Sequence, residues 1–382
     1  LLLGNIAGHE IQLKGSGLTV FSRRGSDGVG AIGPMLREHL VSTFMHAVGV
    51  PTTRSLAVLT TGEKVIRQNG AVPGGIVVRV AKSHLRVGTV QYAATQSEDL
   101  VRQIVTAAGF DNAASLLETV TRRHFDLVAH WMRIGFVHGV MNTDNMSISG
   151  ETIDYGPCAF MDAYDPATVF SSIDRTGRYA YANQPMIAKW NLARLAECLL
   201  PLFDAGPDAA VEEAYRILEG FTQTFKSAYL SGFGAKLGLQ TQRDGDAALI
   251  ESLLERMAQQ RADFTLTFRR LGPAAESTDA FEAVAALFDD PAAFMDWAEG
   301  WRARLDQEPM EPGARRRAMD RVNPAIIPRN HLVETVLAAA GEGDLKPFEV
   351  LSRALSAPYQ ASPDHEAAPP PPAQPYRTFC GT

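Results

Sequence analysis

Residues 136–160 read FVHGVMNTDNMSISGETIDYGPCAF, and this stretch decides how the rest of the chain is interpreted. Two apolar residues and a His-Gly pair precede a polar cluster at positions 142–145, which contains the first acid, Asp144. A second acid, Asp154, follows ten residues later. Amide and carboxylate oxygens are ligands that hard cations such as Mg²⁺ prefer, and a loop carboxylate can accept the proton of a hydroxyl. The stretch therefore predicts a site for metal-bound phosphates. The alternative is a plain turn between two strands, because Asn, Asp and Gly favour turns for local reasons.

The spacing of these residues matches a protein-kinase catalytic loop at all but one position. His138 and Asn145 fit the pattern H-x-D-x-x-x-x-N, and Asp154 stands where kinases carry the metal-binding Asp that precedes an aromatic residue and Gly. At the position of the catalytic Asp the chain has Val140, which cannot accept a proton. Either Asp144 takes the acid/base role in a different geometry, or the site is inactive.

A Lys and a Glu nearer the N-terminus fit the same scheme. The stretch 11–17 predicts a short strand that ends at Lys14. An unpaired buried ammonium at this position would be costly. The helix predicted over 34–48 has a Pro at its start, Gly49 after its end and Glu38 in its first turns. A strand Lys and a helix Glu form the ion pair of a kinase-like lobe, so we expect Lys14 and Glu38 to pair. The alternative is an edge-strand Lys in solvent.

The segments HGVMNTDNMSI and TIDYGP closely resemble the signature of the selenoprotein O family. The similarity continues through DAYDP, GRYAYANQP and WNLARLAE, so that it covers roughly residues 11–200 and again 320–382. Members of this family have a protein-kinase-like fold but transfer AMP, not phosphate, to protein hydroxyls. The resemblance implies an α+β, two-lobed fold with a small β-rich N-lobe, a large helical C-lobe and an extended C-terminal tail.

Composition and periodicity place the boundaries of these parts. Four consecutive prolines near the C-terminus favour an extended polyproline segment over a packed element. The predicted parts are the N-lobe, incomplete at its N-terminus, at 1–95; the helical C-lobe, with the catalytic loop 136–160, at 96–357; and the Pro-rich tail at 358–382. The phosphate-covering glycine loop of a kinase-like lobe is expected to precede Leu1.

Within the lobes, the pattern predicts individual elements. Residues 51–66 read as two strands around a turn at Thr61-Gly62. Residues 208–305 read as helices throughout, because their apolar positions recur at helical spacing. On the apolar helix that begins near Ile187, we interpret Trp190 and Leu192 as core residues.

Two arginines and one polar loop are candidates for phosphate contacts. Arg79 lies on a β-branched strand and Arg86 follows seven residues later, and two such arginines could hold phosphate oxygens bidentately. They could equally be surface charges. The resemblance implies that both positions contact phosphates and that the loop containing Asp27 and Gly28 touches the nucleotide. In that family ATP is flipped relative to a kinase, so that the α-phosphate faces the acceptor.

Carried across residue by residue, the resemblance implies a complete site. Lys14 and Glu38 would position phosphates, and Asp144 would act as the base on a Ser, Thr or Tyr hydroxyl of a protein substrate. Asn145 and Asp154 would ligate Mg²⁺ or Mn²⁺, with ATP as the second substrate. The implied nucleotide-binding residues are Lys14, Asp27, Gly28, Arg79, Arg86 and Asp154.

The composition of the chain limits the kinds of partner and the cellular compartments that we expect. The chain has 382 residues, 46% of them hydrophobic, which is enough for two packed lobes. A net charge of −7 argues against a nucleic-acid partner. No apolar run reaches the roughly 18 residues of a membrane span. The resemblance implies a cytoplasmic protein of bacterial type, or a mitochondrial one in a eukaryote.

Three cysteines are too few for a disulfide framework and favour a reducing compartment. Cys380, on the terminal tail, is well placed for redox chemistry. The resemblance implies a pair between a C-terminal Cys and one in the activation segment, as in some bacterial members. Phe170 occupies the matching position here, which leaves Cys158 as the nearby candidate partner.

Three functions remain open on the sequence. The first is transfer of AMP to proteins by an adenylyltransferase, which Val140 beside intact Asp144, Asn145 and Asp154 favours. The second is a kinase that transfers the γ-phosphate. The third is a nucleotide-binding scaffold without catalysis.

Overall fold

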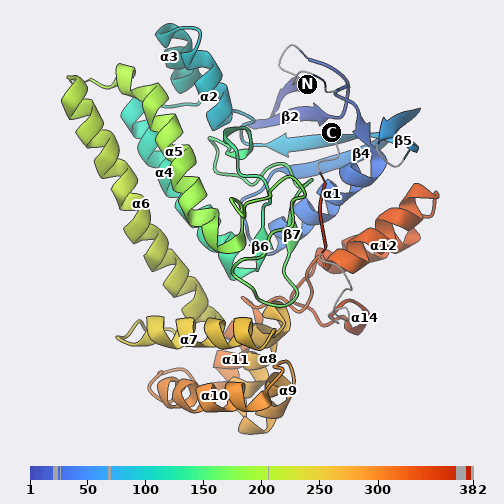
Figure 1. The fold of residues 1–382 in the computed structure, drawn as a ribbon, viewed down its shortest axis with the longest axis vertical. Coiled ribbons are helices and arrows are strands. Elements are labelled where there is room, and N and C mark those ends of the chain that lie inside the picture. Colours follow the sequence, from blue (N-terminus) through green and yellow to red (C-terminus); the bar gives the residue numbers. More distant parts are fainter. Residues whose placement is uncertain (20–24, 26, 68–69, 205, 367–375, 380–382) are drawn as a thin grey trace.

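The computed structural model describes residues 1–19, 25, 27–67, 70–204, 206–366 and 376–379. A small β-sheet with one long helix forms one part of the molecule, and helices form most of the remainder (Figure 1). This α+β arrangement confirms the fold class expected from the sequence. None of the described helices is both long enough and apolar enough to cross a membrane.

The sheet has five antiparallel strands, in the order β1-β2-β5-β3, with β4 also paired to β5. The strands are β1 (Leu2–Ile6), β2 (His9–Lys14), β3 (Gly30–Ala31), β4 (Arg54–Arg67) and β5 (Gly70–Ala81). In the β2–β5 register, Lys14 lies opposite Val77 and Gln12 lies opposite Arg79. Because paired residues share a face and side chains alternate along a strand, Lys14 and Arg79 are diagonal neighbours on one face.

Helix α1 (Ile32–Ala47) packs against β4 and β5 and covers this face. Its apolar residues Met35, Leu40 and Phe44 are fully buried. Burial of this stripe fixes the rotation of the helix, and Glu38, which is only 2% exposed, thereby faces the two cations of the sheet.

The predicted pair of strands around Thr61-Gly62 is wrong. Strand β4 runs without a break from Arg54 to Arg67, and its register against β5 shifts between Thr60 and Lys64. Gly62 has a φ of +78°, a left-handed conformation that a local irregularity in a strand accommodates with glycine. Residues of β4 on both sides of the shift pair with the same strand, β5. The antiparallel pair is therefore formed by β4 and β5, and not by the two halves of residues 51–66.

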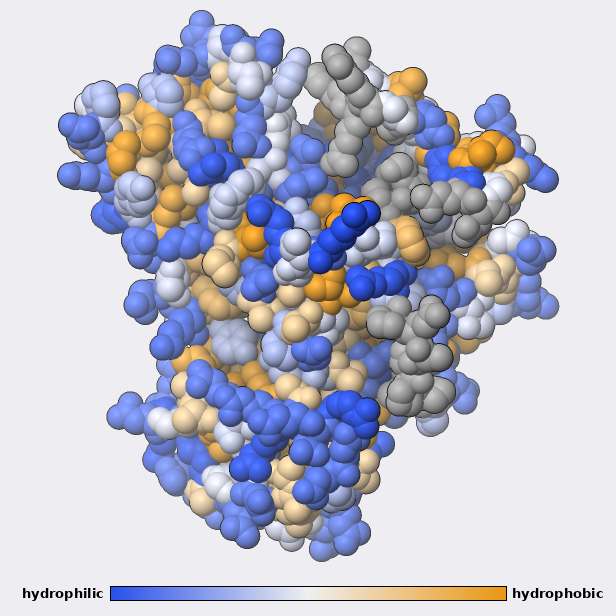
Figure 2. All heavy atoms as spheres, viewed as in Figure 1, coloured by the Kyte–Doolittle hydropathy of each residue, from blue (hydrophilic) through white to orange (hydrophobic). Residues whose placement is uncertain are grey.

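Thirteen described helices follow the sheet, and among them α4 packs along α5 and α6. The helices are α2 (Val87–Ala94), α3 (Glu98–Ala107), α4 (Ala113–Arg133), α5 (Gln184–Leu199), α6 (Pro207–Lys236), α7 (Asp246–Gln259), α8 (Phe264–Glu276), α9 (Phe281–Ala285), α10 (Pro291–Leu305), α11 (Pro312–Asp320), α12 (Asn330–Gly341), α13 (Lys346–Leu355) and α14 (Pro363–Glu366). Hydrophilic residues cover most of the helical surface on the face shown in Figure 2.

Two expectations for the apolar helix had different outcomes. Leu192 is fully buried, as predicted, within α5. Trp190 is 41% exposed, so its assignment to the core is wrong. The helix buries Ile187, Ala188 and Asn191 instead, and Trp190 lies outside that stripe.

The stretch at 136–160 forms a long loop between two short paired strands, β6 (Phe136–Val137) and β7 (Ala159–Phe160). Most of this loop is buried, including His138, Met141 and Tyr155, which are fully buried. Such an extensive buried loop excludes the simple two-strand turn that was the alternative reading of its composition.

Candidate active site

Four charged side chains from three parts of the fold meet at the end of the sheet. Lys14 Nζ donates to Glu38 Oε2 at 2.9 Å and also pairs with Asp154. Arg79 donates from Nη2 to Glu38 Oε2 at 2.8 Å and to Asp154 Oδ1 at 3.3 Å. Its Nε pairs with the second oxygen of Glu38. The predicted Lys14–Glu38 ion pair is present, and the solvent alternative for Lys14 is excluded.

Within this cluster, mutual attraction outweighs the cost of burial. Burial alone would raise the pKa of Glu38, but the charges of Arg79 and Lys14 lower it below its usual value. The pKa of Asp154 is likewise lowered, because Lys14 and Arg79 act against the burial that would raise it. Burial would lower the pKa of Lys14, but Asp154 and Glu38 raise it. All these groups are therefore ionised at neutral pH.

Asp154 is held in an uncommon backbone conformation. Its φ is +69°, in the left-handed region that a residue other than glycine seldom adopts. The residues on both sides are anchored: Ile153 O lies 2.9 Å from His138 Nε2, and the hydroxyl of fully buried Tyr155 pairs with Thr52. This surrounding structure holds the Asp154 carboxylate toward the two cations.

Asn145 lies on a short 3₁₀ turn, Thr143–Asn145. Its Nδ2 donates to the carbonyl of Val140 at 2.9 Å, and its backbone N–H donates to Asn142 O at 3.0 Å. Val140 therefore contributes a backbone acceptor that orients the Asn145 amide, although its side chain has no acid/base function. The bond from Nδ2 leaves the Asn145 carbonyl oxygen for other partners.

A divalent cation fits the donor set of this loop. Asp154 is ionised and offers carboxylate oxygen, and Asn145 offers an amide oxygen, both of which suit Mg²⁺ or Mn²⁺. Among the described residues no group of three or more His, Cys, Asp or Glu side chains is placed to hold a metal. Two protein ligands are what Mg²⁺ commonly uses when substrate phosphates and water complete its shell.

Asp144 is exposed beside the first turn of α2, and a glycine makes room for it. A Cβ at Gly88 would lie 2.2 Å from Asp144 Oδ1. The loop and the helix start are tied together, because Val87 N donates to Met146 O at 2.9 Å. Sequence reasoning missed Gly88, and no single-sequence signal marks it, since its role depends on this contact.

Arg86 is the residue before α2, not the end of a strand. Burial and the charge of Arg79 lower the pKa of Arg86, while the carboxylates of Asp154 and Asp144 act in the opposite direction. Its Nε is buried and has no hydrogen-bond partner among the described residues. A buried donor without a partner is costly, and a bound anion would satisfy it.

Asp27 lies apart from this cluster. Its carboxylate is 53% exposed and pairs with Arg67 Nη1 at 2.9 Å, at the end of β4. Gly28 has a φ of +69°, and a Cβ there would lie 2.4 Å from Gly17 O. The close approach joins the end of β2 to the start of β3, where Gly17 N donates to Gly28 O at 3.0 Å.

The family model for protein adenylyltransferase SelO matches residues 3–356. The chain belongs to this family. It is 54% identical over 407 residues to the protein nucleotidyltransferase YdiU of a Methylorubrum extorquens strain, a match that covers 100% of the chain and 82% of the relative. The YdiU of Bradyrhizobium diazoefficiens is 54% identical, with 100% and 81% covered, and that of a Rhodopseudomonas palustris strain is 53% identical, with the same coverage. The chain is therefore a nucleotidyltransferase of the SelO family.

In this SelO-family chain, helix α5 supports loop 136–160, the candidate catalytic loop. Gln184 accepts from His138 N at 3.0 Å and donates to Phe136 O at 2.9 Å. Asn191 donates to Met141 O at 2.9 Å. Both amide side chains are fully buried. Sequence reasoning missed these two supports, although a buried amide on an otherwise apolar helix is a signal that could have identified them.

The candidate redox cysteine does not have the surroundings of a reactive thiol. Cys158 is fully buried, and burial raises the pKa of its thiol to about 12. It is a free cysteine whose Sγ donates to Tyr155 O at 3.2 Å. Cys380, its candidate partner, lies outside the described residues. The buried thiol argues against redox activity at Cys158, because the thiolate is the reactive form.

The end of the tail nevertheless docks where the SelO resemblance placed a disulfide. Thr378 forms a parallel bridge with Ser171, and its N–H donates to Phe170 O at 2.8 Å. Its hydroxyl donates to Pro157 O at 2.6 Å. Tyr376 contacts the Phe170 ring, with centroids 6.1 Å apart. Backbone pairing and an aromatic contact thus hold the tail at Phe170, which cannot form a disulfide.

Arg37, next to Glu38 on α1, joins the tail to the catalytic unit. Its guanidinium donates to Cys158 O at 2.5 Å and to the Tyr376 hydroxyl at 3.2 Å. Tyr376 in turn donates to Glu334 on α12 at 2.5 Å. One buried arginine therefore connects α1, the segment after Asp154, and the C-terminal tail.

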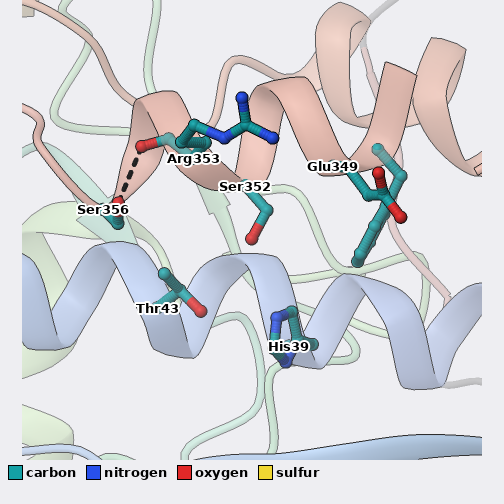
Figure 3. Close-up of a pocket in the computed structure, with 7 residues that line it drawn as sticks. His39, Thr43, Glu349, Ser352, Arg353 and Ser356 are labelled. Carbon is teal, nitrogen blue, oxygen red and sulfur yellow. Dashed lines mark hydrogen bonds between the residues drawn. The ribbon is translucent and has the colours of Figure 1, made fainter. Parts of the chain in front are cut away.

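One groove lies on another side of α1, where the helix faces α13 (Figure 3). His39 and Thr43 of α1 and Phe348, Glu349, Ser352, Arg353 and Ser356 line it. None of the charged residues of the cluster takes part in this lining. The groove is therefore separate from the candidate active site.

Proposed function

We propose that the chain transfers AMP from ATP to Ser, Thr or Tyr hydroxyls of proteins and releases pyrophosphate. The observation that carries this proposal is Val140 in the kinase base position beside an otherwise complete cluster of Lys14, Glu38, Asp154 and Asn145. Membership in the SelO adenylyltransferase family supports it. A conventional kinase reaction would need a base where this chain has only a backbone carbonyl.

The proposed step is a displacement at the α-phosphorus. The acceptor oxygen forms a bond to this atom, the bond to the bridging oxygen toward the β-phosphate breaks, and pyrophosphate leaves. The hydroxyl proton passes to the carboxylate of Asp144, which is exposed and beside the start of α2. When bound at Asn145 and Asp154, Mg²⁺ or Mn²⁺ would polarise phosphate oxygens.

The proposal includes the flipped orientation of ATP, and the cations of the site support it. Lys14 and Arg79 are fixed by Glu38 and Asp154, so their positions do not depend on the nucleotide. Arg86 has an unpartnered buried Nε that a phosphate oxygen would satisfy. Three cations on one side of the site favour burial of the β- and γ-phosphates there, which leaves the α-phosphate toward the acceptor. In this proposal the Asp27–Gly28 loop contacts the nucleotide from the side of β3.

The experiment uses ATP labelled separately at the α- and γ-phosphates, with Mg²⁺ or Mn²⁺ and a protein acceptor. Label from α-ATP alone, lost in Asp144→Asn and Asp154→Ala, supports AMP transfer. Label from γ-ATP would establish a kinase, and nucleotide binding without any label would establish a scaffold. The matched control is Asp289→Ala, because Asp289 is an exposed carboxylate that pairs with Arg261 far from the cluster.

A further inference from the structure

Trp190 occupies an unusual position on the surface of α5. It is 41% exposed, whereas the other three tryptophans of the chain, Trp131, Trp297 and Trp301, are at most 3% exposed. Met186, one turn earlier, is 67% exposed. Residues four apart share one face of a helix, so Met186 and Trp190 form one apolar surface in solvent. An exposed indole does not contribute the stabilisation that burial of a large aromatic side chain gives, and exposed apolar surfaces mark sites where a partner binds.

Two guanidinium groups lie against the indole ring. The Arg178 guanidinium carbon is 4.8 Å and that of Arg194 is 5.2 Å from a Trp190 ring centroid. Arg194 also pairs with Glu197, which offsets its charge. Among the described residues no carboxylate forms a salt bridge with Arg178. The exposed charge of Arg178 is therefore uncompensated in a chain whose net charge is −7.

Arg178 is presented by a fixed turn. Both oxygens of Asp174, a buried residue, accept backbone N–H groups, from Arg178 at 2.9 Å and from Tyr179 at 2.8 Å. The turn belongs to the segment between β7 and α5, which follows Asp154. Because the backbone is anchored and the guanidinium rests on an aromatic ring, little conformational entropy remains to be lost when Arg178 binds an anion.

The helix that carries this surface, α5, also supports the candidate catalytic loop. Trp190 precedes Asn191, which lies on the adjacent, buried face of α5 and donates to Met141 O, three residues before Asp144. The helix thus has one face under the loop that carries the candidate base and an adjacent face that carries the exposed indole. The Trp190 side of α5 is therefore connected through one helix to the loop that carries Asp144.

We propose that Arg178, Met186, Trp190 and Arg194, here called the Trp190 patch, bind an acidic segment of the acceptor protein. Carboxylates of the segment pair with Arg178, and an apolar side chain beside them covers Trp190 and Met186. Aromatic and arginine side chains are the residue types that most often dominate protein interfaces. The proposal rests on the proposed function, since it names the class of acceptor that the transferase selects.

Binding can be tested without catalysis, because Trp190 is the one tryptophan that a solvent quencher reaches among four that the structure describes. The probes are synthetic peptides with a central Ser and one Leu, flanked by Glu, by Gln or by Lys. We expect the Glu-flanked peptide to reduce acrylamide quenching of the protein, the Lys-flanked peptide to leave it unchanged, and Trp190→Phe to abolish the effect. Quenching that the Glu-flanked peptide does not alter would overturn the proposal.

Selection is tested by AMP transfer from α-labelled ATP to the same peptides. We expect kcat/KM to be about fivefold higher for Glu than for Gln flanks at low salt, and the preference to fall as ionic strength rises. Arg178→Glu should lower kcat/KM for the Glu-flanked peptide at least to the value for the Gln-flanked peptide, so that the preference is lost. The matched control is Arg216→Glu, because Arg216 is an exposed helical arginine that pairs with Glu213 on α6.

The two proposals fail in different ways. If neither a peptide nor a protein acceptor receives α-label from the unaltered chain, the proposed function is wrong, and the quenching measurement still decides whether the patch binds acidic segments. If all three peptides are labelled equally, or if Arg178→Glu and Arg216→Glu behave alike, the transferase stands and the Trp190 patch is not its acceptor site.

Discussion

Arg79 on β5 and Glu38 on α1 form a two-point ion pair that the rest of the active-site cluster shares. Arg79 Nη2 donates to Glu38 Oε2 at 2.8 Å, its Nε pairs with the other oxygen, and Lys14 reaches the same carboxylate at 2.9 Å. Both partners of the pair are nearly inaccessible, at 3% and 2% exposure. A carboxylate that holds two cations must keep its charge, and this requirement has consequences for stability as well as for catalysis.

Glu38→Gln should destabilise the fold at neutral pH. Removal of one partner leaves two buried cations with less compensation, which typically costs about 3 kcal/mol or more. We expect urea denaturation at pH 7 to show a loss of this order. The change should also weaken ATP binding, because Lys14 and Arg79 would no longer be fixed.

The pH dependence of this loss has a definite sign. The folded-state pKa of Glu38 lies below its usual value of 4.5, so the charged pair adds stability above that pH. As the pH falls below about 4.5 toward the lower folded value, the natural chain loses this contribution and the difference from Glu38→Gln should shrink. A difference that stayed constant down to acid pH would contradict the argument. The control Glu213→Gln removes a carboxylate at the surface of α6, whose pair with Arg216 is screened by solvent, and should change both curves much less.

Gly88→Ala should impair catalysis without unfolding the chain. The added methyl would lie 2.2 Å from Asp144 Oδ1, so the carboxylate must move. Displacement of a catalytic group by about 1 Å can cost about 100-fold in rate. We expect kcat for AMP transfer to fall by one to two orders of magnitude, with ATP binding retained, since Lys14 and Asp154 are untouched. Gly220→Ala, in a helix position with open space around it, is the matched control and should keep full activity.

The charged cluster could be predicted from the sequence because each member occupies a characteristic place. Lys14 at a strand end, Glu38 early in a helix and Asp154 before an aromatic residue and Gly were identified separately, and the structure brings them together. Strand pairing places Lys14 and Arg79 on one face, and the apolar stripe of α1 turns Glu38 toward them. Local pattern and hydrophobic burial are sufficient for this much.

Other features depend on contacts that no local pattern encodes. Trp190 belongs to an apolar helix and was assigned to the core, yet the rotation of α5 that buries Asn191 leaves it in solvent. The residues Thr61 and Gly62 are typical of a turn, but here they form an irregularity within β4, because β5 is long enough to pair with β4 on both sides of them. Arg37 and Tyr376 are 339 residues apart in the chain and meet only because the tail returns to α1.

Tyr376→Phe should loosen the junction between the tail and the catalytic unit. The phenol hydroxyl accepts from Arg37 and donates to Glu334, and its loss removes both bonds while retaining the ring contact with Phe170. We expect a loss of about 1–2 kcal/mol in the free energy of unfolding. Hydrogen exchange should also quicken at the amide of Ser172, which donates to Thr378 O at 2.9 Å.

Arg377→Ala is the control for this change, because Arg377 is an exposed neighbour in the same tail segment. It should leave both the unfolding free energy and the exchange of Ser172 unaltered. Equal behaviour of the two variants would mean that the hydrogen bonds of the Tyr376 hydroxyl contribute nothing and that the tail is held by its other contacts.

Cys158 should resist thiol reagents in the folded chain. Burial raises the pKa of its thiol to about 12, so that only about one thiol in 10⁴ is ionised at pH 8, and the sulfur is inaccessible to solvent. Arg37 and Thr378 also hold the backbone of this segment, because they donate to the carbonyls of Cys158 and Pro157. We expect iodoacetamide at pH 8 to modify Cys158 only after denaturation, with partly exposed Cys198 as the internal comparison in the same peptide map. Modification of Cys158 in the native chain as fast as that of Cys198 would show that this segment opens readily, and would return the thiol to consideration as a redox group.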